Sequence, residues 1–142
     1  MPNWSEGSMR LRGKKADIKR FIKRLEKSDN DDWFYIPGTR RAFVIGEPYS
    51  IDEIVEVFLA EDEPDPTTVA LHVCQAWGID VKSFIEISEN YHLDIRIDTV
   101  ERGMMFTEHY EIIDGEVTEN SGESYETVQD FEWNVPYSFL GG

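Results

Sequence analysis

The hydrophobic period of this chain changes at Gly13, and this change constrains the fold more than any other feature. Residues 8–13 alternate apolar and polar side chains, which is typical of a half-buried strand. Four apolar residues then recur at helical spacing: Ile18, Phe21, Ile22 and Leu25. They predict an amphipathic helix over residues 14–28. A strand that leads directly into such a helix indicates a sheet with a helix packed against one face.

Two short strands and a second helix are predicted in the next part of the chain. The strands are expected at 33–36 and 41–45. Ser50 and Glu53 stand at the spacing of a capping box, which predicts a helix starting at Ile51 and running to about residue 60.

The second half of the chain continues the mixture of strands and helices. Residues 68–77 fit both strand and helix spacing, and their β-branched residues favour a strand. A helix at 80–91 and a strand at 93–98 follow. Asp114-Gly115 is typical of a two-residue hairpin turn. Alternating apolar residues at 131–137 predict a last strand.

These elements predict one α+β domain over residues 1–142, ferredoxin-like in character. We expect an antiparallel sheet of about five strands with two or three helices on one face. Residues 47–66 are a candidate insertion and residues 136–142 are expected to be a flexible tail. The predicted core consists of Leu11, Ile18, Phe21, Ile22, Leu25, Phe43, Ile45, Val73, Phe84, Ile87, Ile95, Ile97, Phe106, Tyr110 and Ile112.

Charge is strongly segregated along the sequence. Residues 1–41 hold eleven Lys and Arg against six Asp and Glu, a net charge of about +5. Residues 42–142 hold three against twenty-three, a net charge of about −20. Such a division of charge indicates which partners the protein attracts and not which reaction it catalyses, because it sets the electrostatic field that an approaching molecule meets.

No motif in the sequence predicts catalysis or metal binding. There is no G-x-S-x-G string, and the three histidines and Cys74 lack the spacing of zinc sites. His72 and Cys74 would share one face of a strand, but a lone cysteine usually behaves as a buried small hydrophobe. We therefore expect no catalytic residues, no metal site and no cofactor.

The sequence also indicates a compartment. A single cysteine allows no intramolecular disulfide, the first residues lack the apolar stretch of a signal peptide, and no apolar run approaches the length of a membrane span. The chain is therefore expected to be a cytoplasmic protein without membrane contact.

Several short pieces resemble the YubB-like family, plasmid and phage proteins with a ferredoxin-like domain. The pieces are Met1-Pro2-Asn3-Trp4, Met9–Gly13, Trp77-Gly78, Glu101–Phe106, Asp114-Gly115-Glu116 and Glu132-Trp133. They lie within residues 1–28 and 75–134, whereas 33–66 have no counterpart. The resemblance implies a ferredoxin-like fold and a bacterial mobile-element setting, and it implies no catalytic activity.

The resulting functional expectation is a non-enzymatic accessory protein of a bacterial plasmid, phage or integrative element that acts by protein–protein binding or self-association. The candidate contact residues are the cations of the first helix: Lys19, Arg20, Lys23, Arg24 and Lys27. Two alternatives stay open. The acidic remainder could mimic DNA and occupy a nucleic-acid-binding protein, or the helix at 14–28 could itself contact nucleic acid. The simplest competing explanation is that these cations only neutralise neighbouring carboxylates.

Overall fold

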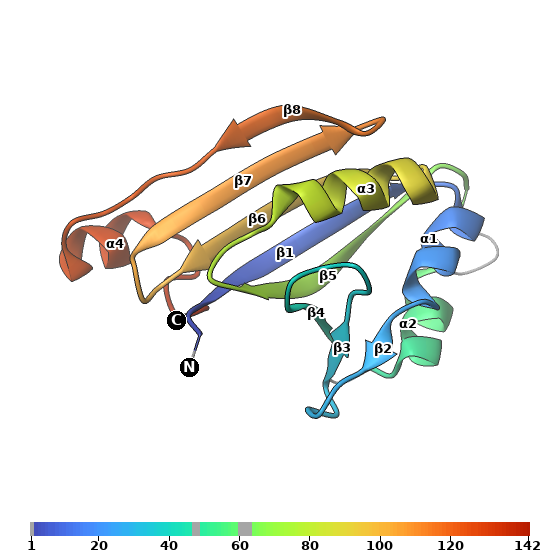
Figure 1. Ribbon diagram of the computed structural model, residues 1–142, viewed down its shortest axis with the longest axis horizontal. Helices are drawn as coiled ribbons and strands as arrows, with labels where there is room; N and C mark the ends of the chain where they lie inside the picture. The colour runs from blue at the N-terminus through green and yellow to red at the C-terminus, as the bar shows by residue number, and fades with distance from the viewer. Residues whose placement is uncertain (1, 47–48, 60–63) are drawn as a thin grey trace.

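The computed structural model describes residues 2–46, 49–59 and 64–142. Twelve elements lie in this part of the chain: β1 (Trp4–Gly13), α1 (Lys15–Ile22), β2 (Glu26–Lys27), β3 (Trp33–Tyr35), β4 (Ala42–Ile45), α2 (Ile51–Phe58), β5 (Thr67–Ala76), α3 (Val81–Tyr91), β6 (Asp94–Glu101), β7 (Phe106–Ile113), β8 (Glu116–Ser121) and α4 (Val128–Asn134). The strands form one antiparallel sheet in the order β2-β3-β4-β5-β1-β6-β7-β8 (Figure 1).

This architecture confirms the α+β class, but the prediction of a ferredoxin-like sheet of about five strands with two or three helices is wrong. The described residues form eight strands and four helices. The edges explain much of the difference. Strand β2 has only two residues, and all six residues of β8 are exposed. Hydrophobic alternation identifies a strand only when one of its faces is buried, so both edges escape that criterion.

The first helix is shorter than the predicted 14–28. It ends with Lys23 as its C-cap, and two tight turns follow, in which the Arg24 amide donates to the Phe21 carbonyl and the Leu25 amide to that of Ile22. The side chain of Leu25 is buried all the same. Leu25 therefore reaches the core at the position that the helical spacing predicts, although it lies in a turn and not in the helix. Glu26 and Lys27 then join the sheet as β2.

The predicted strand at 131–137 is a helix instead. Residues 128–134 form α4, and Thr127 caps it by accepting a hydrogen bond from the Asp130 amide at 3.1 Å. Phe131 and Val135 are both buried. Because they are four residues apart, they fit one side of a helix as well as one side of a strand.

Other local predictions are confirmed. The helix at 80–91 is α3, residues 67–76 form strand β5, and Ser50 accepts a hydrogen bond from the Glu53 amide at the start of α2. Asp114 and Gly115 both have positive φ, as a hairpin turn of this kind requires. Residues 47–48 and 60–63 of the candidate insertion at 47–66 lie outside the described residues.

The three helices α1, α2 and α3 cover one face of the sheet and share the main core with it. Met9, Leu11, Ile95 and Ile97 project into this core from the central strands. In β4 the predicted orientation is reversed. Ala42 and Val44 are buried, whereas Phe43 and Ile45 point to the opposite face.

Within the described part of the chain, the second face of the sheet is covered only at one end. Helix α4 lies there, and Phe131 and Val135 pack against Val100 of β6 in a small separate core. The chain then returns across the sheet, where the Gly142 amide donates to the Trp4 carbonyl at 3.0 Å. At Gly141, φ is +77°, and a Cβ would lie 2.6 Å from two backbone oxygens, so this contact requires glycine.

Candidate functional site

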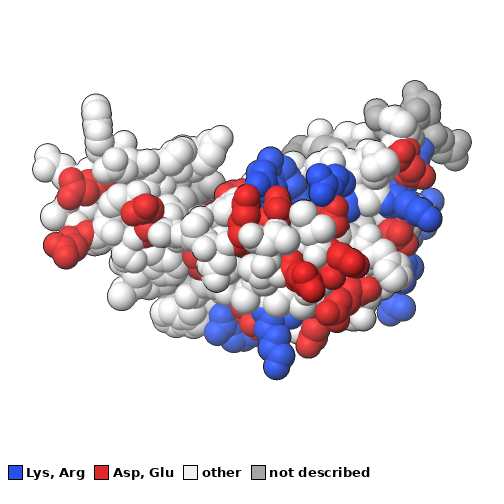
Figure 2. Space-filling model, turned by 90° about the horizontal axis from the view of Figure 1, so that it is seen from above, with Lys and Arg blue, Asp and Glu red and all other residues white. Residues whose placement is uncertain are grey.

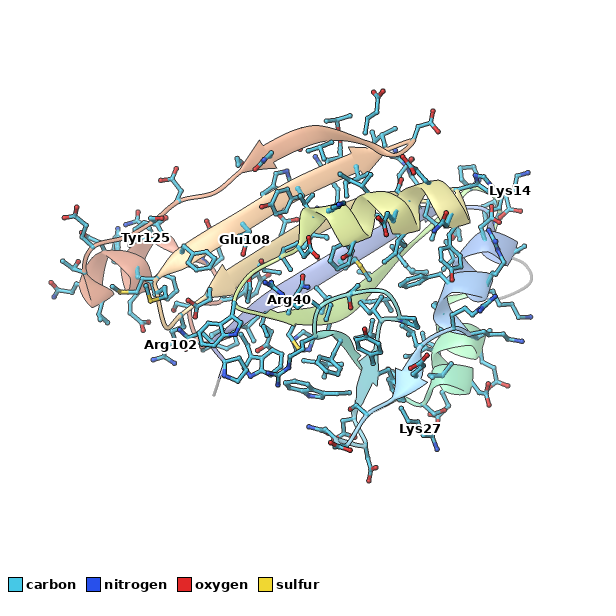
Figure 3. The ribbon with its side chains drawn as sticks, viewed as in Figure 1. Lys14, Lys27, Arg40, Arg102, Glu108 and Tyr125 are labelled. Carbon is cyan, nitrogen blue, oxygen red and sulfur yellow. The ribbon has the colours of Figure 1, made fainter. Side chains whose placement is uncertain are left out.

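The predicted contact residues gather at one end of the molecule. We call Lys19, Arg20, Lys23, Arg24 and Lys27 the basic surface, and all five are exposed. Figure 3 labels Lys14 above this surface and Lys27 at its lower end, next to α1 and β2. In Figure 2 Lys and Arg side chains lie along the same end of the molecule, others lie nearer its middle, and acidic side chains stand between them.

Arg20 differs from the other cations of the basic surface. Its guanidinium lies 3.3 Å from the Asp17 carboxylate and 4.9 Å from the centroid of the Tyr91 ring. Lys19, Lys23, Arg24 and Lys27 form no ion pair with any described residue. Most of the basic surface is therefore not neutralised by the residues that the structure describes.

A groove of about 840 Å³ lies on the second face of the sheet, between its central strands and α4. In Figure 2 the outline is hollowed between the α4 end and the charged side chains at the centre. The strand side chains that line it include Glu6, Ser8, Arg10, Ala70, His72, Asp98, Thr107 and His109. The opposite wall consists of Tyr125 and residues of α4 and the segment after it: Asn134, Val135, Pro136, Tyr137 and Leu140.

Strand register explains why these polar side chains meet. His72 of β5 stands opposite Ser8, Ser8 opposite Asp98, and Asp98 opposite His109. Side chains opposite each other in antiparallel strands project from the same face and lie close together. The four residues therefore form one row across the floor of the groove, although they are far apart in sequence.

His72 and Glu6 form a close pair on this floor. The His72 Nε2 atom lies 2.5 Å from the Glu6 carboxylate, which also accepts a hydrogen bond from the Gly141 amide at 3.1 Å. The hydrogen bond with His72 lowers the pKa of Glu6, although burial opposes the shift. Glu6 therefore stays ionised and fixes both the imidazole and the returning C-terminal segment.

His109 lies between two carboxylates. Its Nδ1 atom is 2.6 Å from Asp98, and its Nε2 atom is 2.7 Å from Glu119. The bond with Glu119 raises the pKa of His109, and the same bond lowers the pKa of Glu119. Arg10 holds the other oxygen of Asp98 at 3.3 Å, and Arg96 holds Glu119 at 2.9 Å. The imidazole is thus favoured in its protonated form.

Cys74 does not complete a catalytic pair with His72. Its side chain is buried, which confirms the sequence expectation, and burial raises the pKa of the thiol to about 12, with a further contribution from the charge of Glu6. The nucleophile in cysteine chemistry is the thiolate. A thiol with this pKa carries almost no thiolate at neutral pH, so the pair lacks an activated nucleophile.

Among the carboxyls that the structure describes, only Glu108 has a raised pKa, and it belongs to the helix-covered face. Burial is the main cause of the shift. The carboxyl accepts hydrogen bonds from the Ile79 amide and the Ser5 hydroxyl at 3.1 and 3.2 Å. These contacts fasten the loop before α3 to β7. Figure 3 shows Glu108 in the first half of that strand.

No group of three or more His, Cys, Asp or Glu among the described residues has the geometry of a metal site. His92 stands apart from the other histidines, at the C-cap of α3. The groove was not predicted from the sequence, because its wall depends on α4. The spacing of Thr127 and Asp130, a capping box before an apolar run, was the signal that could have revealed this helix.

No family model, curated protein or solved structure matches the chain. The resemblance to the YubB-like family therefore stays a prediction. No helix in the described part of the chain is long and apolar enough to cross a membrane.

Proposed function

We propose that this chain is a non-enzymatic binding protein that docks a protein partner through the basic surface. Following the sequence expectations, we place it in the bacterial cytoplasm as an accessory factor of a mobile element. The observation that carries the proposal is that four exposed cations at one end of the molecule form no ion pair with a described residue. Their field is left available to a partner.

The explanation by neutralisation of neighbouring carboxylates is weakened by the same observation. Of the five cations of the basic surface, only Arg20 has a carboxylate partner among the described residues. A cluster of like charges that lacks local partners repels itself, and an acidic partner would relieve that repulsion. An acidic surface on a partner protein is therefore the chemistry that fits this end of the molecule.

The proposal that the acidic surface mimics DNA has less support. Several carboxylates of the second sheet face are already paired with arginines: Asp94 with Arg12, Asp98 with Arg10, and Glu119 with Arg96. A mimic of the phosphate backbone needs carboxylates that are free to meet the cations of its target. On this face, arginines of the same molecule already neutralise much of the negative charge.

The test compares two variants with the same net charge. One carries Lys19→Gln, Lys23→Gln and Lys27→Gln. The control carries Ser124→Glu, Asn120→Asp and Gln129→Glu, three exposed positions far from α1 in the sequence. Both lower the net charge by three, so a difference between them reports position and not total charge.

Tagged wild-type and variant proteins are incubated with nuclease-treated bacterial lysate, and retained proteins are quantified by mass spectrometry. The proposal predicts an acidic protein that wild type and control retain, that the lysine variant loses, and that salt releases. Equal retention by all three would contradict it. Retention that is seen with untreated lysate and is absent with nuclease-treated lysate would assign the basic surface to nucleic acid instead.

A further inference from the structure

The sheet has an open edge at strand β8. This strand is the last in the strand order, no described strand lies beyond it, and Figure 1 shows it along the upper border of the sheet. All six of its residues are exposed. We propose that this edge binds an extended basic peptide of a partner protein, which adds to the sheet as a further antiparallel strand. The site is separate from the basic surface and does not depend on its function.

The backbone along this edge has hydrogen-bonding groups to offer. The Thr107 amide of β7 donates to the Glu123 carbonyl at 2.8 Å, so the backbone of Glu123 faces β7. Backbone groups of successive strand residues point alternately to the two sides of the strand. No described strand therefore meets the outward N–H and C=O groups, which belong to Asn120, Gly122 and Ser124.

The side chains along the edge exclude a second copy of the chain as its occupant. Open edges are often protected by lysine or proline, and residues 116–125 contain neither. Their charged side chains are Glu116, Glu119 and Glu123. If two copies paired through β8, these glutamates would meet their own counterparts, and like charges opposite each other destabilise a strand pair. The edge is closed to a second copy and open to a strand of opposite charge.

The charge around the edge selects a basic occupant. Residues 103–142 hold nine Asp and Glu and no Lys or Arg. Glu119 is already paired with an arginine and a histidine. Glu116 and Glu123, by contrast, form no ion pair with any described residue. A lysine or arginine placed opposite such a carboxylate stabilises a strand pair.

The alternation of the edge also fixes the pattern of the occupant. Glu119 and Glu123 project from the second face of the sheet, and Asn120 and Gly122 belong to the other face. Opposite side chains of an antiparallel pair share a face. The occupant therefore carries its cations on alternate residues, opposite the glutamates. It donates its hydrogen bonds to the edge from the residues between those cations.

The probes are short peptides with blocked ends, added to the isotope-labelled full chain and followed by NMR titration at pH 7. One peptide alternates lysine and valine, and another alternates glutamate and valine. Two further versions of the lysine peptide carry N-methyl groups on every valine or on every lysine. These two have the same charge and composition, but only methylation of the valines removes the donors that face the edge.

We expect the lysine peptide to bind at least about 3-fold more tightly than the glutamate peptide, with shifts of the Asn120, Gly122 and Ser124 amides. Methylation of the valines should weaken binding at least about 10-fold, because it removes several backbone hydrogen bonds at once. Methylation of the lysines should change binding less than about 3-fold, since their N–H groups point away from the edge.

Two variants with the same net charge locate the site. Glu116→Gln with Glu123→Gln should weaken binding of the lysine peptide at least about 3-fold. The control is Asp31→Asn with Glu56→Gln, which changes the residue two places before β3 and a residue of α2, and it should leave binding unchanged. All four side chains are exposed, so neither variant should unfold the domain.

Several results would overturn the proposal. They are equal binding of the lysine and glutamate peptides, equal effects of the two methylations, equal effects of the two variants, and no shift at the edge when the lysine peptide is added. Sedimentation of the chain alone as a dimer, with the Asn120, Gly122 and Ser124 amides protected from exchange, would assign the edge to a second copy instead.

Discussion

Replacing Phe131 by alanine should release α4 without unfolding the rest of the domain. Phe131 is 1% exposed, packs with Val100 and Val135, and meets the Tyr125 ring edge to face at 5.9 Å. Removing a buried phenylalanine side chain typically costs about 3–5 kcal/mol. Among the described residues this core has three buried members, and the residues around it, Met105, Tyr125 and Leu140, are only partly buried, so little other packing holds the helix.

The measurable consequence separates local from global unfolding. If α4 unfolded together with the sheet, a loss of 3–5 kcal/mol would lower the melting temperature by roughly 10–15 °C in a domain of this size. We expect a shift below about 5 °C, because the helix detaches first and the main core on the other face keeps its packing. Hydrogen exchange should show fast exchange confined to residues 128–142.

Val128→Ala is the matched control on the same helix. Val128 is 65% exposed, so its truncation should change stability by less than about 0.5 kcal/mol and leave hydrogen exchange unaltered. A single cooperative transition lowered by 10 °C or more in the Phe131 variant would refute the view that α4 and its small core form a separable unit.

Three further predictions follow from the titratable groups. Burial raises the pKa of Glu108, so ionising this carboxyl costs stability as the pH rises above about 4.3. The Glu108→Gln variant should therefore gain stability relative to wild type between pH 4 and pH 8. If urea denaturation gave the same difference in unfolding free energy between the two proteins at every pH, it would contradict this prediction. The hydrogen bonds with Glu119 and Asp98 raise the pKa of His109 in the folded protein. The stabilisation from its protonated imidazole is therefore complete below about pH 6.5 and is lost as the pH rises through the pKa of the folded state. The stability advantage of wild type over His109→Gln should shrink from pH 6 to pH 9 in the same assay. With a thiol pKa of about 12, Cys74 should resist iodoacetamide at pH 8 in the native protein and react after denaturation, and equal rates in both states would show that it is accessible.

The sequence was most informative where a segment buries one face. The helix at α3 and the central strand β6 follow directly from hydrophobic spacing, because each has a clear buried side. In β4 the alternation was visible, but its orientation was predicted wrongly. Phe43 belongs to an aromatic cluster on the second face, where its ring lies 6.0 Å from that of Trp4 and 5.5 Å from that of Trp33. Because β4 carries large apolar residues on both of its faces, its sequence does not show which face is buried in the main core.

The two candidate sites also differ in how far the sequence could predict them. The basic surface could be predicted, because its residues are neighbours in sequence on one helix and the turn after it. The groove could not be predicted in this way, because its floor depends on strand order and register. His72 and His109 share a row only because β1 and β6 lie between their strands. Periodicity identifies strands, but it does not give their order in the sheet.

The central claim is that the basic surface serves a partner rather than the stability of the domain. Melting temperature and partner retention, both measured on the variant with Lys19, Lys23 and Lys27 replaced by glutamine, test this most directly. Lys19, Lys23 and Lys27 form no ion pair with a described residue, so each should contribute near the lower end of the range of about 0–1 kcal/mol for exposed charges. We therefore expect the melting temperature to stay within about 3 °C of wild type while retention is lost. A clearly lower melting temperature with unchanged retention would show that these cations only stabilise the fold.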